Sequence, residues 1–161
     1  MERCVKCGFP NTRPGIIFKD GVCGACINYD KRKFIDWKGR EDELERLCAK
    51  YRGKGKYDCL VGASGGLDSS YVLYVAKTML GLNPLAVKFD HGFNYEVANE
   101  NIVNLCRNLE IDLRVYKSPG THDFRYVREM AQALRPLGLY WGICKFCHYI
   151  LPSVAFREAV R

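Results

Sequence analysis

The chain has 161 residues, of which 48% are hydrophobic and 27% charged, and its formal net charge is +7. This length suits one ordinary domain with a small appendage, and the composition is that of a soluble globular protein. No apolar run approaches the ~20 residues of a membrane-spanning helix, and no apolar segment follows the N-terminus as in a signal peptide. We therefore expect a cytoplasmic protein without membrane insertion. Its positive charge favours an anionic partner such as a nucleotide, a nucleotide-sugar or RNA.

Nine cysteines are many for a chain in a reducing compartment, where they point to metal binding or chemistry rather than to disulfides. Residues 1–30 hold four of them, as Cys4-x-x-Cys7 and Cys23-x-x-Cys26. Two turns with this spacing present four thiolates tetrahedrally to one Zn²⁺. We expect a zinc ribbon in which the metal staples a segment too short for its own core. An iron–sulfur cluster is the less favoured occupant.

Residues 31–56 form the second predicted segment, a charged connector followed by a helix from Glu41 and a stretch rich in glycine and lysine. The predicted helix carries its apolar residues at helical spacing: Leu44, Leu47, Cys48 and Tyr51.

The apolar run Tyr57–Ala63 predicts a strand that leads directly into Ser64–Ser70, here called the phosphate loop. An amphipathic helix is expected from about Asp68, and Gly81 ends it. The residues predicted to face the core of the protein from this helix are Tyr71, Val72, Val75, Ala76, Met79 and Leu80.

Strands and helices then alternate to the end of the sequence. The expected elements are Leu85–Phe89 (strand), Val97–Leu109 (helix), Ile111–Tyr116 (strand), Thr121–Leu134 (helix) and Cys144–Val160 (helix). The first of these helices is expected to bury one face, made of Ala98, Ile102, Leu105, Cys106 and Leu109. This alternation predicts an α/β fold with a parallel sheet and right-handed crossovers, formed by residues 57–161.

The phosphate loop has the composition of an anion site. Two consecutive glycines let the backbone approach an anion, and the N–H groups and dipole of the following helix point to the same place. Serine hydroxyls add donors, while the Asp68 carboxylate indicates a Mg²⁺ ion between itself and the phosphates. The loop lies at the carboxyl end of the first strand, where parallel α/β sheets bind ligands. No lysine follows the glycines, so it is not a Gly-x-x-x-x-Gly-Lys-Ser/Thr loop.

Three strands make a narrow sheet, and the strand that leads into the phosphate loop would lie at an exposed edge. We expect an incomplete sheet, either because the chain is the N-terminal part of a longer protein or because a homo-oligomer covers the edge.

The stretch Ser64–Ser69 resembles the PP-loop of the N-type ATP pyrophosphatases, which have the three-layer, Rossmann-like adenine-nucleotide alpha-hydrolase fold. Nearly the whole chain resembles, within that group, the N-acetyl sugar amidotransferases of surface-polysaccharide biosynthesis. The matching pieces are Cys4-x-x-Cys7, Gly21-Val22-Cys23-x-x-Cys26, Ile35-Asp36-Trp37, Tyr57-Asp58-Cys59-x-Val61-Gly62-x-Ser64-Gly65-Gly66, Gly81-Leu82-Asn83-Pro84-Leu85 and Asn99-Glu100-Asn101-Ile102.

This resemblance implies that ATP adenylylates the amide oxygen of a nucleotide-linked acetamido sugar and releases pyrophosphate. Ammonia from a separate glutaminase subunit then displaces AMP and leaves an acetamidino group. The chemistry is reasonable because an amide carbonyl is a poor electrophile, and a phosphate ester on its oxygen becomes a leaving group. The loop would bind the departing pyrophosphate, so no side-chain nucleophile is required.

The resemblance also implies roles for individual residues. Ser64 and Asp68 would be catalytic, with Asp68 acting through Mg²⁺. Asp90 would accept a hydrogen bond from a ribose hydroxyl, although a plain turn role is equally open. The implied nucleotide-binding set is Ala63, Ser64, Gly65, Gly66, Asp68, Ser69, Ser70, Lys88 and Asp90.

Cys144-x-x-Cys147 leaves a choice open. At a helix start, residues i and i+3 share one face. Related tRNA-thiolating enzymes hold an iron–sulfur cluster with such a pair and a distant third cysteine, for which this chain offers only Cys106 in a helical pattern. A second metal or sulfur site and a pair of structural thiols are both compatible with the sequence. The alternative function is therefore a tRNA sulfurtransferase, with tRNA as partner. A non-catalytic ATP-binding module with a zinc ribbon is the second alternative.

Overall fold

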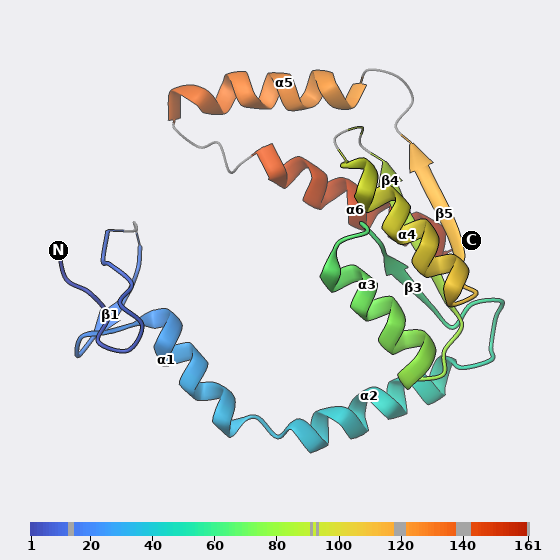
Figure 1. Cartoon of the computed structure of the whole chain (residues 1–161), viewed down its shortest axis with the longest axis horizontal. Coiled ribbons are helices and arrows are strands. Elements are labelled where there is room, and N and C mark those ends of the chain that lie inside the picture. Colours follow the sequence, from blue (N-terminus) through green and yellow to red (C-terminus); the bar gives the residue numbers. More distant parts are fainter. Residues whose placement is uncertain (13–14, 91, 93, 118–121, 138–142, 161) are drawn as a thin grey trace. The chain divides into compact units, whose positions relative to one another are not determined.

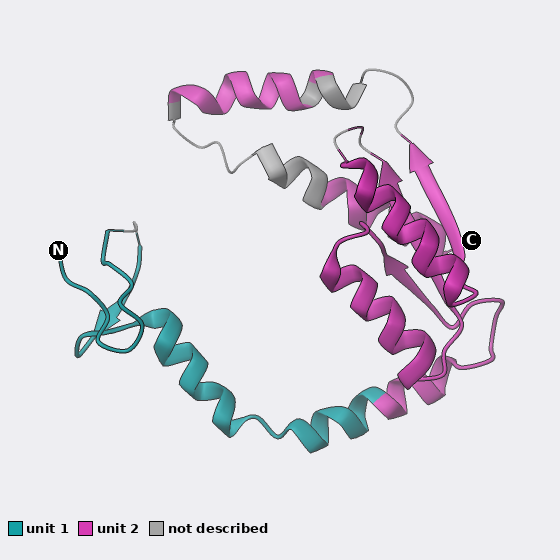
Figure 2. Cartoon of the chain, in the orientation of Figure 1, with its two compact units in different colours: residues 1–44 teal, residues 45–161 magenta. Residues whose placement is uncertain are grey.

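The computed structural model describes residues 1–12, 15–90, 92, 94–117, 122–137 and 143–160, and within these all side chains except those of residues 122–124, 126, 137 and 143–148. The chain divides into two compact units, Met1–Leu44 and Glu45–Arg161 (Figure 2). Among the described residues, none of the helices combines the length and apolar character that a bilayer crossing requires.

The first unit is built around a hairpin and two knuckles, the segments Cys4-x-x-Cys7 and Cys23-x-x-Cys26. Strands β1 (Phe18–Lys19) and β2 (Val22–Cys23) pair antiparallel across Asp20 and Gly21. Both turn residues have positive φ, 50° and 73°, as a two-residue hairpin turn requires. The N–H of Val5 donates to the Gly21 carbonyl at 3.0 Å, which joins the first knuckle to the hairpin. Helix α1 (Gly24–Lys31), the 3₁₀ turn η1 (Arg32–Phe34) and the start of α2 (Trp37–Tyr51) follow.

The second unit contains a parallel sheet of β3 (Cys59–Gly62), β4 (Pro84–Asp90) and β5 (Asp112–Lys117), in the order β3-β4-β5. The predicted parallel sheet is confirmed, and β3 is an edge strand of this sheet (Figure 1). The central strand β4 is buried from Pro84 to Lys88 because helices cover both of its faces.

One face of the sheet is covered by α3 (Leu67–Tyr74) and α4 (Glu96–Asn108). Their contact with the sheet forms the core, which consists of Ala63, Leu73, Ala86, Ile102, Cys106 and Ile111. The predicted inner face of α4 is confirmed at Ile102 and Cys106, and Leu105 and Leu109 pack against the same cluster.

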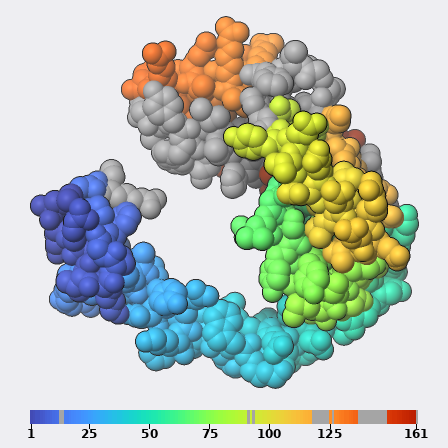
Figure 3. All heavy atoms as spheres, in the orientation of Figure 1, coloured from blue at the N-terminus to red at the C-terminus, as the bar shows by residue number. Residues whose placement is uncertain are grey.

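The predicted inner face of α3 is confirmed at Ala76 but wrong at Tyr71 and Val72, which are 60% and 51% exposed. Leu73, which the prediction left out, is fully buried. The 3.6-residue period does not persist, because α3 continues into a π-helical turn, η2 (Val75–Met79), in which Leu80 N–H donates to the Val75 carbonyl at 2.9 Å. Figure 3 shows the α3 segment, in green, along the surface of the second unit.

The opposite face of the sheet is covered by α6 (Ile143–Ala159), which follows α5 (His122–Leu134) and the 3₁₀ turn η3 (Arg135–Leu137). The buried Glu158 of α6 pairs with Arg114 of β5. Thr121, where a helix was expected to begin, lies outside the described residues, as do the side chains of Cys144 and Cys147 within α6.

Candidate functional site

The phosphate loop leaves the sheet at the carboxyl end of β3. The Ala63 N–H still donates to the Val87 carbonyl at 2.8 Å, so the sheet continues one residue beyond the strand. Gly65 then adopts φ +86°, and a Cβ atom there would lie 1.9 Å from the Ala98 carbonyl oxygen of α4. Only glycine fits this position, because both the conformation and the space exclude a side chain.

Hydrogen bonds within the loop hold its shape. The Ser64 hydroxyl accepts from Gly66 N–H at 3.3 Å and lies 3.1 Å from the Ser69 hydroxyl. Ser69 Oγ accepts from Ser64 N–H and donates to the Gly66 carbonyl, both at 3.2 Å. Ser70 N–H donates to the same Gly66 carbonyl at 3.1 Å, which is the i to i−4 hydrogen bond that opens α3. The loop is therefore preformed at the N-terminus of α3, where the first N–H groups of a helix lack partners within it.

Asp68 lies exposed in the first turn of α3, and Ser69 and Ser70 are half-buried beside it. The structure thus brings together all the loop residues that the sequence indicated. An exposed carboxylate next to free helix N–H groups can hold a hydrated Mg²⁺ against a phosphate chain.

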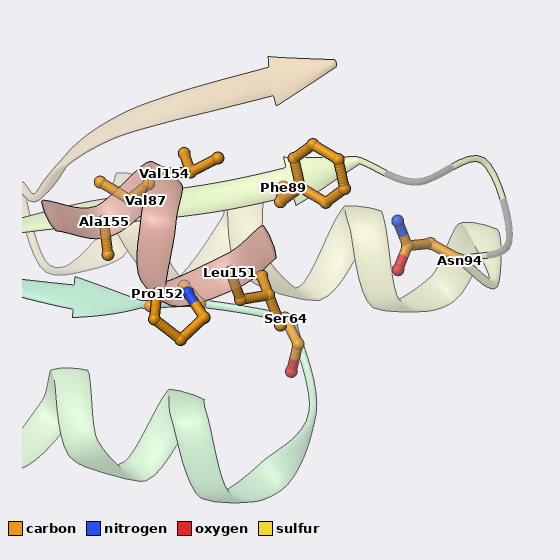
Figure 4. Close-up of a pocket in the computed structure, with 10 residues that line it drawn as sticks. Ser64, Val87, Phe89, Asn94, Leu151, Pro152, Val154 and Ala155 are labelled. Atoms are coloured by element: carbon orange, nitrogen blue, oxygen red, sulfur yellow. The ribbon is translucent and has the colours of Figure 1, made fainter. Parts of the chain in front are cut away.

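A cavity of about 390 Å³ adjoins the loop on the face of the sheet that α6 covers. Figure 4 shows α6 residues facing Val87 and Phe89 of β4, with Ser64 and Asn94 nearby. The lining is largely apolar, as in ligand sites that accept a flat ring and fix it with a few polar groups. Its members are Gly62, Ala63, Ser64, Val87, Phe89, Asn94, Leu151, Pro152, Val154 and Ala155.

Asp90 and Lys88 extend from β4 but differ in their surroundings. Asp90 accepts from Gly92 N–H at 3.0 Å and from the Asn94 amide at 3.3 Å, and Lys117 lies 3.8 Å away. The Gly92 N–H, helped by Asn94 and Lys117, lowers the pKa of the Asp90 carboxyl. Lys88 does not line the cavity: its Nζ donates to Asn99 Oδ1 of α4 at 2.5 Å.

The four N-terminal cysteines converge in the first unit, with all Sγ atoms within 4.8 Å of one another. The Cys4–Cys26 and Cys7–Cys23 sulfur distances are 3.9 and 3.7 Å. A tetrahedral ion with Zn–S bonds of about 2.3 Å separates its sulfurs by about 3.8 Å, so the cluster fits Zn²⁺.

Hydrogen bonding supports a thiolate at this cluster. The Cys23 N–H donates to Cys4 Sγ at 3.3 Å, and this bond is the main cause that lowers the pKa of Cys4 to about 6. The pKa of Cys26 is raised to about 12, first by its hydrogen bond with Cys7, because four neighbouring thiols cannot all ionise without a cation.

Sequence reasoning missed several residues around the cavity. Asn94 follows the second strand, and four lining residues belong to α6, far along the chain. The one signal in that region was Pro152, which stands inside a helix that it would ordinarily interrupt. Asn99, the partner of Lys88, belongs to one of the matching sequence pieces, but nothing in that pattern indicates its contact with Lys88.

The model of the PP-loop domain family matches residues 39–137, which are more than half of the chain, so the chain belongs to this family. The adenine-nucleotide alpha-hydrolase-like α/β fold that the loop indicated is thereby confirmed. An uncharacterised protein of Methanocaldococcus jannaschii is 30% identical over 124 residues, which cover 76% of this chain and 45% of that protein. A glutamine-hydrolysing GMP synthase of Pyrobaculum aerophilum is 32% identical over 74 residues, 45% of this chain and 15% of that enzyme.

Among solved structures, the NH₃-dependent NAD synthetase of Campylobacter jejuni has a TM-score of 0.50 at 16% identity, over 78% of this chain and 53% of that one. This likeness shows the fold alone. The U34-tRNA thiolase NcsA of Methanococcus maripaludis, with its [4Fe-4S] cluster, is more distant, with a TM-score of 0.34 at 19% identity over 73% and 38% of the two chains. The chain spans about half or less of the length of each of these proteins.

Proposed function

We propose that this chain carries the ATP site of an amidotransferase that splits ATP into AMP and pyrophosphate. The observation that supports this most directly is the preformed phosphate loop at the carboxyl end of β3, beside a largely apolar cavity. The adenine ring would occupy the cavity and the phosphates would lie on the loop. Membership of the PP-loop domain family agrees with this arrangement.

The proposed role of each residue in binding ATP follows from its position at the loop or at the end of β4. Ser64, Ser69 and the N–H groups at the start of α3 bind the β- and γ-phosphates that leave as pyrophosphate. Asp68 would hold Mg²⁺, which supplies charge neutralisation to the departing pyrophosphate. Asp90, kept ionised by Gly92 N–H, accepts a hydrogen bond from the ribose.

The proposed substrate is a nucleotide-linked N-acetyl sugar. The amide oxygen attacks the α-phosphorus, the bond to pyrophosphate breaks, and ammonia then displaces AMP to leave an acetamidino group. The sequence pieces shared with N-acetyl sugar amidotransferases support this choice, since they occur in both units of the chain. A separate glutaminase subunit would supply ammonia, and the similarity to a glutamine-hydrolysing GMP synthase is in keeping with that source.

A tRNA sulfurtransferase is the second candidate. It is favoured by the placement of Cys144 and Cys147 in the first turns of α6 and by the net charge of +7. The cysteine pair would carry sulfur or, with a third ligand, an iron–sulfur cluster, and tRNA would be the acceptor.

The decisive experiment measures AMP and pyrophosphate released from ATP in the presence of ammonium and a panel of nucleotide-linked N-acetyl sugars. Release that depends on both co-substrates is expected. Release that instead requires tRNA and a sulfur donor would establish the second candidate. ATP binding without any cleavage would support the non-catalytic module.

The same assay tests the role of Asp68. Asp68→Asn is expected to abolish turnover without changing the unfolding transition, because the exposed carboxylate contributes little to the fold but would hold the metal. Asp20→Asn is the matched control, since it removes an equivalent carboxylate from a turn in the other unit where asparagine is well tolerated. Unchanged turnover in Asp68→Asn would remove this residue from the mechanism.

A further inference from the structure

Lys88 is a lysine buried in the interior of the second unit. Its side chain extends from β4 toward α4, on the side of the sheet where Ala86 joins the core, and the residue is only 3% exposed. Burial lowers the pKa of its ammonium group, as desolvation does for any cation. Asn99 Oδ1, 2.5 Å from Nζ, is its hydrogen-bond acceptor. A buried charge is costly unless something compensates it.

No carboxylate among the described residues lies within ion-pair distance of Lys88. Asp90 is the acidic group whose charge acts on it, but that carboxylate is engaged by Gly92, Asn94 and Lys117. The hydrogen bond to the neutral Asn99 amide orients the ammonium without neutralising its charge.

Lys88 is held by the part of α4 that packs against the phosphate loop. Asn99 belongs to the first turns of α4, next to Ala98. The carbonyl of Ala98 is the group on which Gly65 packs so closely that no Cβ could be accommodated. The loop and the Lys88 ammonium therefore contact adjacent residues of one helix.

Three sources of positive potential meet at this point. They are the N-terminus of α3, the N-terminus of α4, which has no side-chain cap at Tyr95, and the Lys88 ammonium. The acidic residues in the first turns of these helices, Asp68 of α3 and Glu96 of α4, are both exposed to solvent. Like charges repel, so this arrangement is most stable when an anion lies on the loop.

We propose that Lys88 is a positioning residue of the phosphate loop: its buried ammonium, held by Asn99 behind Gly65, favours the polyphosphate of ATP over an uncharged nucleoside. This inference rests on the proposed function, because it requires ATP to bind at the loop. Lys88 acts through the helix and the loop and does not touch the nucleotide.

Binding of ATP, adenosine and inorganic pyrophosphate to the full chain tests the proposal by calorimetry. Lys88→Met removes the charge with little change in shape. Asn99→Asp keeps the hydrogen-bond acceptor, places a carboxylate at a favourable helix position and neutralises the ammonium. Both variants are expected to bind ATP and pyrophosphate about tenfold more weakly, the size of a charge interaction over several ångströms inside a protein. Their affinity for adenosine should be unchanged.

Lys77→Met is the matched control. Lys77 also makes a hydrogen bond to a neutral oxygen, the Glu110 carbonyl at 3.3 Å, but it belongs to η2, which follows α3 at the end away from the loop. This variant should bind all three ligands as the unmodified chain does.

A signal from the unmodified chain keeps the test independent of variant folding. The ¹⁵N resonance of Lys88 Nζ is expected to shift on addition of pyrophosphate and to stay in place on addition of adenosine. Equal ATP affinity in Lys88→Met and the unmodified chain would overturn the role of Lys88 and leave the proposed function intact. Failure of the unmodified chain to bind ATP or pyrophosphate would overturn both.

Discussion

Gly65 is the residue at which the phosphate loop depends most strictly on its neighbours. Its φ of +86° is rarely adopted by residues with a side chain, and the Ala98 carbonyl fills the space where a Cβ would stand. The neighbouring Gly66 lies at φ −83°, where a Cβ would meet only the Ser64 hydroxyl at 3.4 Å. The two glycines thus have different reasons to be present, which the letters Gly-Gly do not distinguish.

Gly65→Ala is expected to destabilise the second unit by about 3 kcal/mol or more, since a strained conformation and a backbone clash add together. Gly81→Ala is the control: its φ of +59° imposes strain, but nothing lies within 4 Å, so a loss of about 1 kcal/mol is expected. Urea unfolding of both variants measures the difference. Equal losses would mean that the contact with Ala98 yields easily.

In α3 and the π-helical turn that follows it, the apolar periodicity of the sequence does not match the set of side chains that the fold buries. Of the predicted inward stripe, Tyr71, Val72 and Met79 are more than half exposed and Ala76 is buried. Leu73, which lies outside that stripe, is fully buried. Periodicity alone cannot reveal this, because a π-helical turn changes the number of residues per turn and a buried side is defined only by what packs on it.

Leu73→Ala is expected to cost about 3 kcal/mol, because it opens a cavity among Ala63, Ala86 and Ile102. Val72→Ala, one position earlier and 51% exposed, should stay within about 0.5 kcal/mol of the unmodified chain. Urea midpoints measured on the two variants decide between the observed face and the predicted one. A larger loss for Val72→Ala would restore the predicted stripe.

At the scale of the whole molecule, the chain consists of two units that are stabilised in different ways. The second unit has a continuous apolar core between its sheet and helices. The first has few buried residues, and among these Cys4 and Cys23 belong to the sulfur cluster. We therefore expect the first unit to derive its folding free energy from a bound metal, as a sheet with its own core does not need to.

One Zn²⁺ per chain is therefore expected by elemental analysis. Cys23→Ser should release the metal and unfold the first unit, so that its amide signals lose their chemical-shift dispersion in NMR spectra. The unfolding transition of the second unit should persist. Cys59→Ser is the control, because this cysteine lies in β3 outside the cluster, and the zinc content should not change. A chain that contains no zinc, or a second unit that unfolds with the first, would contradict this division.

For the second unit, the order of strands and helices, the parallel α/β class and the position of the phosphate loop could all be predicted from the sequence, whereas the hairpin and α1 of the first unit could not. What could be predicted depends on local features: apolar runs, turn residues and a helix that begins directly after two glycines. Three further features are visible only in the folded chain: Leu73 faces the core, α6 closes a cavity beside Ser64, and Lys88 turns away from this cavity toward Asn99. Each of these depends on contacts between residues distant in the chain, and such contacts leave no local pattern in the sequence.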